Sequence, residues 1–240
     1  RRHRAPGGSR MNRAVVTAFV ATTALVGAGY ILRRRAVQEA PPSRVIPIIT
    51  PVIDLGVAED VLSAMERLPD DDVTVVLHTA GGCVTSCVLI ANALRQFKRS
   101  RAIVPFLAIS GGTLIALNAR TLEMGRNASL SAVDPIVLGQ RARHIRDLGV
   151  TAEEPESLHA LAREYELAME KYVRSTLAAR LPAGDPAALE QAVRVFMGEH
   201  GPHEWPIRRS QVESLGIAVE SAAGMWSEYV DAYRRRWWRL

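Results

Sequence analysis

Hydrophobic runs and helical spacing alternate along this chain, and the alternation predicts an α/β fold. Three apolar runs have the continuous character of parallel strands that are covered on both faces. They lie at 45–49, 73–77 and 102–109. The segments that follow them carry apolar residues at helical spacing, at 57–68, 83–97 and 113–119. Shorter strands are predicted at 121–124 and 129–133. Strands that alternate with helices in this way are typical of stacked βαβ units around a parallel sheet.

The second half of the chain is predicted to be mainly helical. From Glu156 onward, five apolar or aromatic residues recur at helical spacing and form one predicted stripe. They are Leu158, Leu161, Tyr165, Met169 and Tyr172. Further helices are predicted at 185–196, 210–215 and 222–238. Because the last of these is rich in arginine and aromatic residues, it could lie in an anionic lipid interface or dock on a neighbouring subunit.

Residues 14–32 form a stretch without a charged side chain, between Arg13 and an arginine cluster at 33–35. At about 1.5 Å per residue, a helix of this length just crosses a hydrocarbon core of roughly 30 Å. A cleaved signal peptide fits less well, because the candidate cleavage site is poor and arginines follow it. We therefore expect an uncleaved single-pass membrane anchor. Counted from Met11, a candidate initiator, the arginines favour the cytoplasmic side for the domain that follows.

The composition is that of a globular protein, with 48% hydrophobic and 23% charged residues. The net charge of +5 comes almost wholly from arginine, since lysine occurs only at Lys98 and Lys171. Much of the arginine lies at the chain ends beside apolar or aromatic runs, which favours a membrane surface over nucleic acid as a partner. Cys83 and Cys87 lie four residues apart in a predicted helix, where a disulfide fits poorly, so we expect small buried thiols.

Two short glycine-containing runs carry the candidate chemistry. One spans 77–82 and ends in two glycines, and the other spans 109–113 and holds Ser110 before two glycines. A glycine pair lets the backbone approach a bound group and point its N–H groups at a developing negative charge. A serine at a strand-to-helix turn holds its hydroxyl clear of the sheet. Together the runs indicate acyl transfer at a serine nucleophile. The alternative is that Ser110 only caps the helix after it.

Four blocks of the sequence resemble the serine dehydrogenase proteinases, membrane-associated relatives of the ClpP and signal-peptide-peptidase-A proteases. The blocks follow one another in that family's order and spacing between about residues 48 and 219. They contain the motifs LHTAGG (77–82), ISGGT (109–113), SLSAVDP (129–135) and HEWPI (203–207). The resemblance implies the ClpP/crotonase fold, a spiral of βαβ units that frequently assembles into rings. It also implies Ser110 as the nucleophile and the N–H groups of Gly81 and Gly111 as the oxyanion hole.

With the flanking segments included, five regions are expected. They are a basic tail at 1–13, a transmembrane anchor at 14–32, a linker at 33–44, the ClpP/crotonase-like domain at 45–220, and a basic aromatic helix at 221–240.

The sequence departs from the family around the catalytic centre. Ala80 replaces the usual proline before the glycine pair, and Val133 stands where ClpP carries its catalytic histidine. The general base must therefore be another residue. Lys98 is expected in an exposed turn, His78 to pack at the end of a buried strand, and His144 to be exposed among arginines.

Lys171, His203 and Asp134 remain as candidates for the proton-transfer machinery. Lys171 lies on a long predicted helix about 100° away from the apolar stripe, so a solvated lysine is the simpler interpretation. His203, beside a Trp-Pro pair, could act as the base or tether its loop. Asp134 precedes a proline; it could orient a histidine or bind a peptide N–H, or it could only fix the loop.

The sequence thus predicts a membrane-anchored serine peptidase that forms a homo-oligomer and acts on peptides or proteins. It is expected to need no cofactor and to bind no nucleic acid. A catalytically silent, membrane-tethered scaffold of the same fold is the alternative, because the family's histidine and proline are missing and lysine is scarce. A crotonase-type reaction on an acyl-CoA, which would not need the serine, is a third interpretation.

Overall fold

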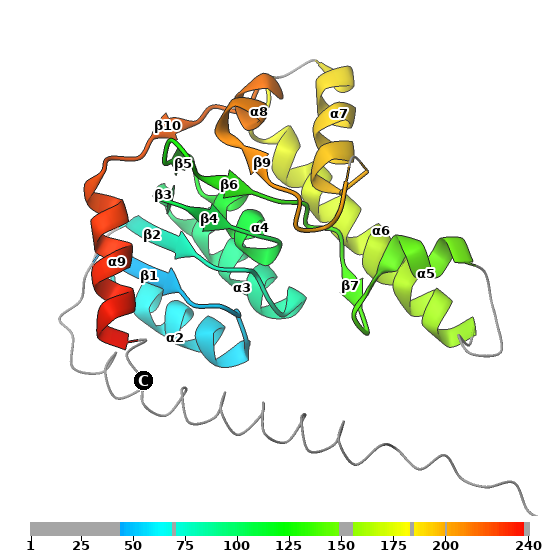
Figure 1. Ribbon diagram of the computed structural model, residues 1–240, viewed down its shortest axis with the longest axis horizontal. Coiled ribbons are helices and arrows are strands. Elements are labelled where there is room, and N and C mark those ends of the chain that lie inside the picture. The colour runs from blue at the N-terminus through cyan, green and yellow to red at the C-terminus, as the bar shows by residue number, and fades with distance from the viewer. Residues whose placement is uncertain (1–43, 69–70, 149–155, 183–184, 200, 238–240) are drawn as a thin grey trace, which may run out of the picture. The chain divides into compact units, whose positions relative to one another are not determined.

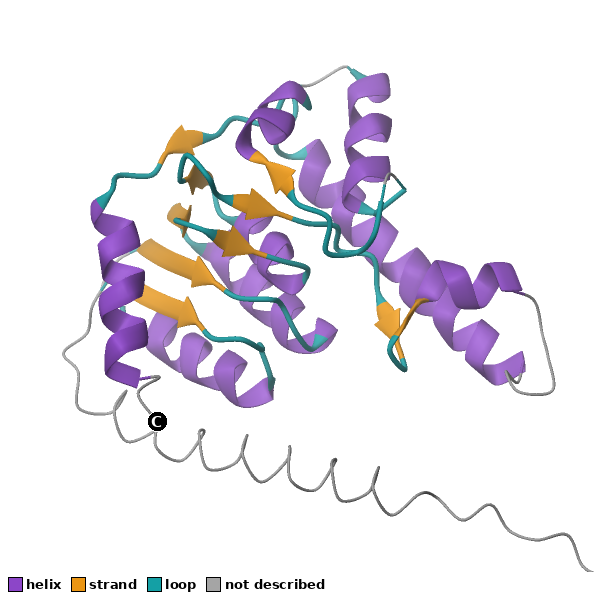
Figure 2. Cartoon of the chain, viewed as in Figure 1, coloured by secondary structure: helices purple, strands orange, loops and turns teal. Residues whose placement is uncertain are grey.

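The computed structural model describes residues 44–68, 71–148, 156–182, 185–199 and 201–237. The chain divides into two compact units, 1–41 and 42–240, and the described residues all belong to the second. Its centre is a five-stranded sheet whose neighbouring strands are all parallel (Figures 1 and 2). The strands, in spatial order, are β1 (Val45–Ile49), β2 (Asp72–His78), β3 (Arg99–Val104), β5 (Thr121–Met124) and β10 (Glu220–Ser221).

Helices connect and cover these strands, as the alternating pattern predicted. The first, α2 (Leu55–Glu66), begins where the Asp54 carboxylate accepts the Val57 N–H at 2.8 Å, which satisfies one of the free donors at a helix start. The later helices are α3 (Val84–Gln96), α4 (Gly111–Asn118), α5 (Ala142–Leu148), α6 (Glu156–Ala178), α7 (Pro186–Phe196), α8 (Arg209–Ser214) and α9 (Met225–Trp237).

Alternate residues of the central strands face two separate cores. Val75 and Ala102 point into the larger core, which α2, α3 and α4 help to form. Val76 and Ile103, one residue further along each strand, point to the opposite face. Because both faces are covered, the strands are apolar along their whole length instead of alternating between apolar and polar residues.

The apolar run at 102–109 forms two strands, where one was predicted. β3 ends at Val104, and the chain continues into β4 (Leu107–Ala108), which pairs in parallel with β6 (Ser129–Leu130) in a second sheet. Pro105 lies at the break, where its lack of an N–H prevents a continuous ladder. β9 (Ile207–Arg208) completes the second sheet, antiparallel to β6. This second sheet carries the turn at Ser110.

The C-terminal helix α9 covers the second face of its own central sheet (Figure 1). Val230 is fully buried against residues of β1, β2 and β3, and Trp226, Tyr229 and Tyr233 pack around it. The sequence had left a lipid interface and a neighbouring subunit as the partners of this helix. Its aromatic side chains pack within the domain to which it belongs, and neither of those two partners is tested by this packing.

The apolar stripe predicted for the long helix α6 is wrong in part. Leu161 and Tyr165 are 42% and 41% exposed. The buried row lies one residue further on, and it includes Glu166, whose carboxylate pairs at 2.7 Å with Arg146 of α5. An ion pair therefore joins these two helices beside the apolar cluster that Ile145 of α5 forms with Ala162 of α6. The residues that α6 buries are Ala162, Glu166, Met169, Val173, Thr176 and Leu177.

The predicted membrane localisation is corrected by the structure. Among the described residues, no helix combines the length and the apolar character that crossing a bilayer requires. Even α6, the longest described helix, carries charged residues over much of its surface. The predicted anchor at 14–32 lies outside the described residues.

Candidate active site

Ser110 occupies a strained turn between β4 and α4. Its backbone angles are φ 53° and ψ −117°, a region that residues with a side chain rarely adopt. The side chain makes no capping hydrogen bond to α4, which removes the simplest structural role considered for it. It is partly exposed at the start of a helix, where the N-terminal dipole favours negative charge. The turn therefore presents a hydroxyl that no hydrogen bond within the described residues engages.

Two buried hydroxyl groups hold this turn in place. The Ser110 N–H donates to Ser131 Oγ at 2.8 Å, and Ser131 Oγ donates to the Ala132 carbonyl at 2.9 Å. The Ser131 N–H in turn donates to Thr113 Oγ1 at 2.9 Å, and that hydroxyl donates to the Ala108 carbonyl at 2.7 Å. Both side chains are fully buried. They were not singled out from the sequence, although hydroxyl residues within apolar segments were the signal that could have found them.

Gly81 lies directly against the Ser110 turn. Its φ is +97°, and a Cβ on Gly81 would be 2.7 Å from Ser110 Cβ and 2.9 Å from the Gly111 nitrogen. Only a glycine allows the two turns to approach this closely. The Gly81 N–H, however, donates to Thr79 Oγ1 at 3.1 Å. The predicted donor is thus next to the nucleophile, but its hydrogen is engaged within its own loop.

Gly82, the next residue, has an N–H that points away from Ile53. Ile53 forms hydrogen bonds with the two neighbours of Gly82. The Ile53 N–H donates to the Gly81 carbonyl at 2.7 Å, and the Ile53 carbonyl accepts the Cys83 N–H at 2.8 Å. Because successive residues of an extended chain direct their polar groups to opposite sides, the Gly82 N–H points away from Ile53. The Gly82 nitrogen would lie 3.7 Å from a Cβ on Gly111.

Gly111 is the first residue of α4, so its N–H has no acceptor within the helix. A Cβ on Gly111 would collide with Cys87 Sγ, at 2.2 Å, so the buried thiol of Cys87 forms the floor beneath this amide. Cys83, at the start of α3, is exposed, which corrects the expectation that both thiols would be buried. Two backbone amides, of Gly82 and Gly111, therefore lie beside Ser110.

Asp134 and His203 are in direct contact. His203 Nδ1 lies 2.9 Å from Asp134 Oδ1, and Arg141 Nε lies 2.6 Å from Asp134 Oδ2. The Asp134 side chain is only 3% exposed. Burial alone raises the pKa of this carboxyl, but the hydrogen bonds from His203 and Arg141 outweigh burial and hold the pKa below its ordinary value. Because Asp134 is enclosed, it is placed to orient the histidine and not to bind a peptide N–H.

Arg141 also ties this pair to a neighbouring loop. It donates to the Gly201 carbonyl at 2.9 Å and to the Gly198 carbonyl at 2.6 Å. The residue comes from the hairpin formed by β7 (Ile136–Val137) and β8 (Gln140–Arg141), which the sequence analysis did not predict. Asp134 therefore helps to fix a loop through Arg141, and it contacts His203 at the same time.

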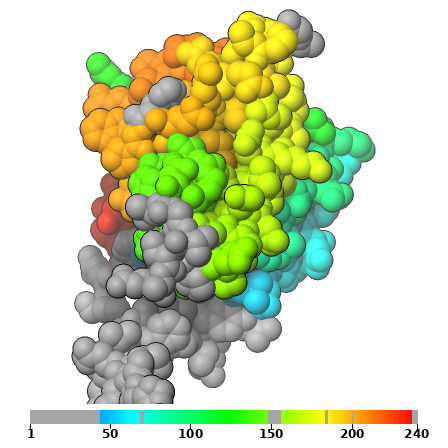
Figure 3. Space-filling model, turned by 90° about the vertical axis from the view of Figure 1, so that its right-hand side faces the viewer, coloured from blue at the N-terminus to red at the C-terminus, as the bar shows by residue number. Residues whose placement is uncertain are grey.

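The second sheet brings Ser110 and the Asp134–His203 pair to the same end. Ala108 pairs with Leu130, and Leu130 pairs with Ile207. Ser110 comes shortly after Ala108, and Asp134 comes shortly after Leu130. Because β9 runs in the opposite direction, the residue at the same end of this strand comes before Ile207, and it is His203. No hydrogen bond among the described residues joins the Ser110 hydroxyl to His203. Figure 3 shows the neighbouring face of the domain, where green residues lie between the yellow-green of α6 and the orange segment that contains β9.

Of the two lysines, neither lies at this site. Lys171 is exposed on α6, in agreement with the interpretation of a solvated side chain. Lys98 pairs with Asp71 at 2.6 Å, beyond the N-terminal end of β3. Among the other histidines, His144 is exposed on α5, as expected. His78 lies on the α9 face of the sheet, in edge contact with Phe106, so it does not face Ser110.

Three comparisons place these features among known proteins. A family model described as "ClpP-like SDH-type serine proteinase" matches residues 36–227. The uncharacterized proteins MJ1495 and MJ0137 of Methanocaldococcus jannaschii are 31% and 30% identical, over 191 and 173 residues that cover 77% and 68% of this chain. The chain spans 64% and 59% of those proteins, less than two thirds of their length.

A solved structure, a mutant of ClpP1 from Listeria monocytogenes, shares the fold. Its TM-score is 0.55 at 13% sequence identity, and the match covers 81% of this chain and 98% of the other. The predicted α/β, ClpP-like fold is therefore confirmed for the described domain.

Proposed function

This chain belongs to the ClpP-like SDH-type serine proteinase family, and on that premise we propose that it hydrolyses peptide bonds with Ser110 as the nucleophile. The observation that carries the proposal is the strained backbone of Ser110, which presents beside two glycine turns a hydroxyl that no described residue engages in a hydrogen bond. Strain of this kind persists only where the surrounding structure holds it, and it is concentrated at functional sites. The buried hydroxyls of Ser131 and Thr113 supply that support.

The oxyanion would be stabilised by the N–H groups of Gly82 and Gly111. When Ser110 attacks the scissile carbonyl, the carbonyl oxygen becomes negatively charged and needs preorganised donors. The Gly111 N–H is free of the helix, and the Gly82 N–H is directed away from Ile53. Gly81 was the donor expected from the sequence, but its N–H bonds Thr79 Oγ1. Its contribution would be the absence of a side chain, which lets its turn pack against Ser110.

We assign the general base to His203. Asp134 accepts at Nδ1, and this leaves Nε2 as the nitrogen that can take the Ser110 proton and return it to the leaving amine. The hydrogen bond from the Ser110 hydroxyl to Nε2 would form when a peptide binds, because catalytic hydrogen bonds are often long or poorly aligned in unliganded sites. No metal or nucleotide takes part in this scheme.

Lys171 offers a direct test of this assignment. We expect His203→Gln to lower the rate of peptide cleavage by about a hundredfold or more, and Lys171→Gln to leave it within about twofold. A reversed result would assign the proton transfer to the lysine.

The second candidate is a catalytically silent member of the same family. It is favoured by the lack of a hydrogen bond between Ser110 and His203 among the described residues, and by Val133 at the position of the ClpP histidine. Val133 is buried, and its N–H donates to the Phe196 carbonyl at 2.7 Å, so it supports the fold only.

A fluorophosphonate probe separates the two candidates. We expect the full chain to be labelled and Ser110→Ala to be unlabelled. Ser175→Ala is the matched control, because Ser175 is exposed on α6 and, among the residues that the structure describes, its hydroxyl bonds only the Tyr172 carbonyl. A folded protein that takes no label supports the silent scaffold, and label that persists in Ser110→Ala contradicts the assigned nucleophile.

We further propose that the ClpP/crotonase-like domain, predicted at 45–220, acts as a homo-oligomer, with α9 packed on its sheet. Exposed Leu161 and Tyr165, four residues apart on one face of α6, support self-association, since apolar side chains gathered on one surface often mark an interface. Light scattering after size exclusion gives the mass. Leu161→Glu is expected to reduce it, whereas a monomeric wild-type chain contradicts this part of the proposal.

A further inference from the structure

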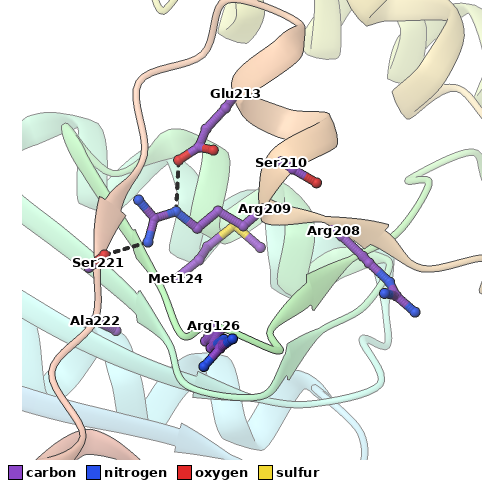
Figure 4. Close-up of a pocket in the computed structure, with 8 residues that line it drawn as sticks. All are labelled: Met124, Arg126, Arg208, Arg209, Ser210, Glu213, Ser221 and Ala222. Carbon is purple, nitrogen blue, oxygen red and sulfur yellow. Dashed lines mark hydrogen bonds and ion pairs between the residues drawn. The ribbon is translucent and has the colours of Figure 1, made fainter.

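Three arginines line a hollow beside β5 and β9, but they do not converge on one ligand. The Arg208 side chain points away from Arg126 (Figure 4). Arg209 is held within the chain, because its guanidinium group pairs with Glu213 and donates to Ser221 Oγ. The reactive group that the proposed proteolysis leaves unused is a thiol next to the candidate catalytic turn.

That thiol belongs to Cys83, which directly follows Gly82. Cys83 is the N-cap residue of α3, and its side chain is exposed and makes no capping hydrogen bond. Its N–H donates to the Ile53 carbonyl at 2.8 Å, which fixes the residue beside the turn that carries the Gly82 amide. An exposed thiol therefore lies one residue from a proposed oxyanion donor.

The start of α3 offers hydrogen-bond donors to this sulfur atom. The N–H groups of Thr85 and Ser86 belong to the first turn, where a helix supplies no acceptor. The Ser86 hydroxyl is fully buried and has no hydrogen-bond partner among the described residues. A Cys83 thiolate is the acceptor these groups can serve. Hydrogen bonding from the Ser86 N–H, helped by its hydroxyl and by Thr85, lowers the pKa of Cys83, although burial acts in the opposite direction.

Cys87, one turn further along α3, has the opposite surroundings. It is fully buried beneath the Gly111 amide, and burial, followed by the nearby Cys83, raises the pKa of its thiol to about 12. Two cysteines four residues apart in a helix hold their side chains poorly for a disulfide, so Cys87 is not placed to pair with Cys83. Since the thiolate is the reactive form, the two thiols are expected to differ strongly in reactivity.

We propose that Cys83 is a modification site that forms mixed disulfides with small disulfide molecules. The Cys83 thiolate attacks one sulfur atom of the small molecule, a bond from Cys83 Sγ to that atom forms, and the original S–S bond breaks. The other half leaves as a thiolate, so the small disulfide is itself the oxidant.

The adduct is expected to block the candidate active site. It places a bulky group one residue from Gly82, where the carbonyl oxygen of the scissile peptide must approach the Gly82 and Gly111 amides. This consequence rests on the proposed function, whereas formation of the adduct depends only on the surroundings of Cys83.

Intact-mass spectrometry of the full chain with glutathione disulfide tests the modification. We expect one adduct per native chain, which dithiothreitol removes, and two adducts per chain in urea, where Cys87 is also accessible. The native Cys83 should react at least about tenfold faster than the native Cys87. Cys83→Ser should take no adduct under native conditions, and it should fold because serine is a preferred N-cap residue. A native wild-type chain without an adduct, or an adduct that persists in native Cys83→Ser, overturns the proposal.

Fluorophosphonate labelling of Ser110 then separates the modification from its effect. The glutathione adduct should slow labelling at least about tenfold, and dithiothreitol should restore the rate. Labelling of Cys83→Ser should be the same with and without glutathione disulfide. An adduct that leaves the labelling rate unchanged overturns the proposed blocking. A chain that takes the adduct but no label in either state contradicts the proposed function of Ser110 and supports the modification of Cys83.

Discussion

His203 Nδ1 lies 2.9 Å from a carboxylate oxygen of Asp134, a residue 69 positions earlier in the chain. The contact forms because β6 and β9 run antiparallel, so the residues after one strand meet the residues before the other. Arg141 Nε bonds the second carboxylate oxygen of Asp134, and the other two nitrogens of the guanidinium group donate to the carbonyls of Gly201 and Gly198. A charged carboxylate is thereby fixed against one edge of the imidazole, while no hydrogen bond from the described part of the chain engages the other ring nitrogen.

The first prediction concerns the Asp134 carboxylate. Asp134→Asn keeps the shape of the side chain but removes its charge, and we expect the rate of Ser110 labelling to fall by about a hundredfold or more. The free energy of unfolding should fall by about 2 kcal/mol, because Arg141 loses a charged acceptor. Labelling kinetics and urea denaturation measure the two effects. Asp147→Asn, at an exposed position on α5, should change neither, and an unaltered labelling rate in Asp134→Asn would exclude the assigned base.

A second prediction compares two glycines that both have a positive φ. Gly81→Ala forces a Cβ to within 2.7 Å of Ser110 Cβ, and Gly139→Ala places one in open space at nearly the same φ. Gly139→Ala should cost only the backbone strain, about 1–2 kcal/mol. Gly81→Ala should cost more than that and should also abolish labelling of Ser110, because the two turns must separate. Equal costs measured by urea denaturation would mean that Gly81 does not press on the nucleophile turn.

The third prediction tests the support beneath the nucleophile. Ser131→Ala leaves the buried Ser110 N–H without its acceptor, which is expected to cost about 1–3 kcal/mol of unfolding free energy. Labelling of Ser110 should slow as the turn loses its fixed geometry. Ser214→Ala removes an exposed hydroxyl whose one hydrogen bond within the described ranges is to the Gln211 carbonyl, so it should change stability by less than about 0.5 kcal/mol. If Ser131→Ala behaves like this control, the positive φ of Ser110 does not depend on Ser131.

More of the fold than of the candidate site could be predicted from the sequence. The runs at 73–77 and 102–109 identified the parallel sheet because burial on both faces leaves an unmistakable apolar signal. The break at Pro105 and the two-residue strands after it could not be predicted, because long-range pairing and not local pattern decides them. Ser110 stood out because a serine before two glycines is a local signal. The contacts of Asp134 with His203 and Arg141 were not evident, since they depend on how distant loops pack.

A fourth prediction follows from His78. Burial, followed by the nearby charge of Arg234, lowers the pKa of this histidine in the folded state below the ordinary value of 6.5. The unfolded chain therefore binds the proton more readily, and the free energy of unfolding should decrease as the pH falls below about 6.5, until the folded-state pKa is reached. Urea denaturation between pH 5 and 8 measures this slope. His78→Phe should flatten the curve over the same range, whereas an unchanged slope would assign the effect to other groups.

The last prediction concerns the attachment of α9 to the central sheet. Val230 is fully buried against Ile49, Val76 and Ile103, so Val230→Ala removes two buried methyl groups and should lower the unfolding free energy by about 2 kcal/mol. Met225→Ala, at a position 62% exposed on the same helix, should have little effect. If α9 were instead held by a partner outside the domain, the two variants would unfold alike in urea. A selective loss in Val230→Ala therefore means that the arginine-rich end of the chain is part of the folded unit.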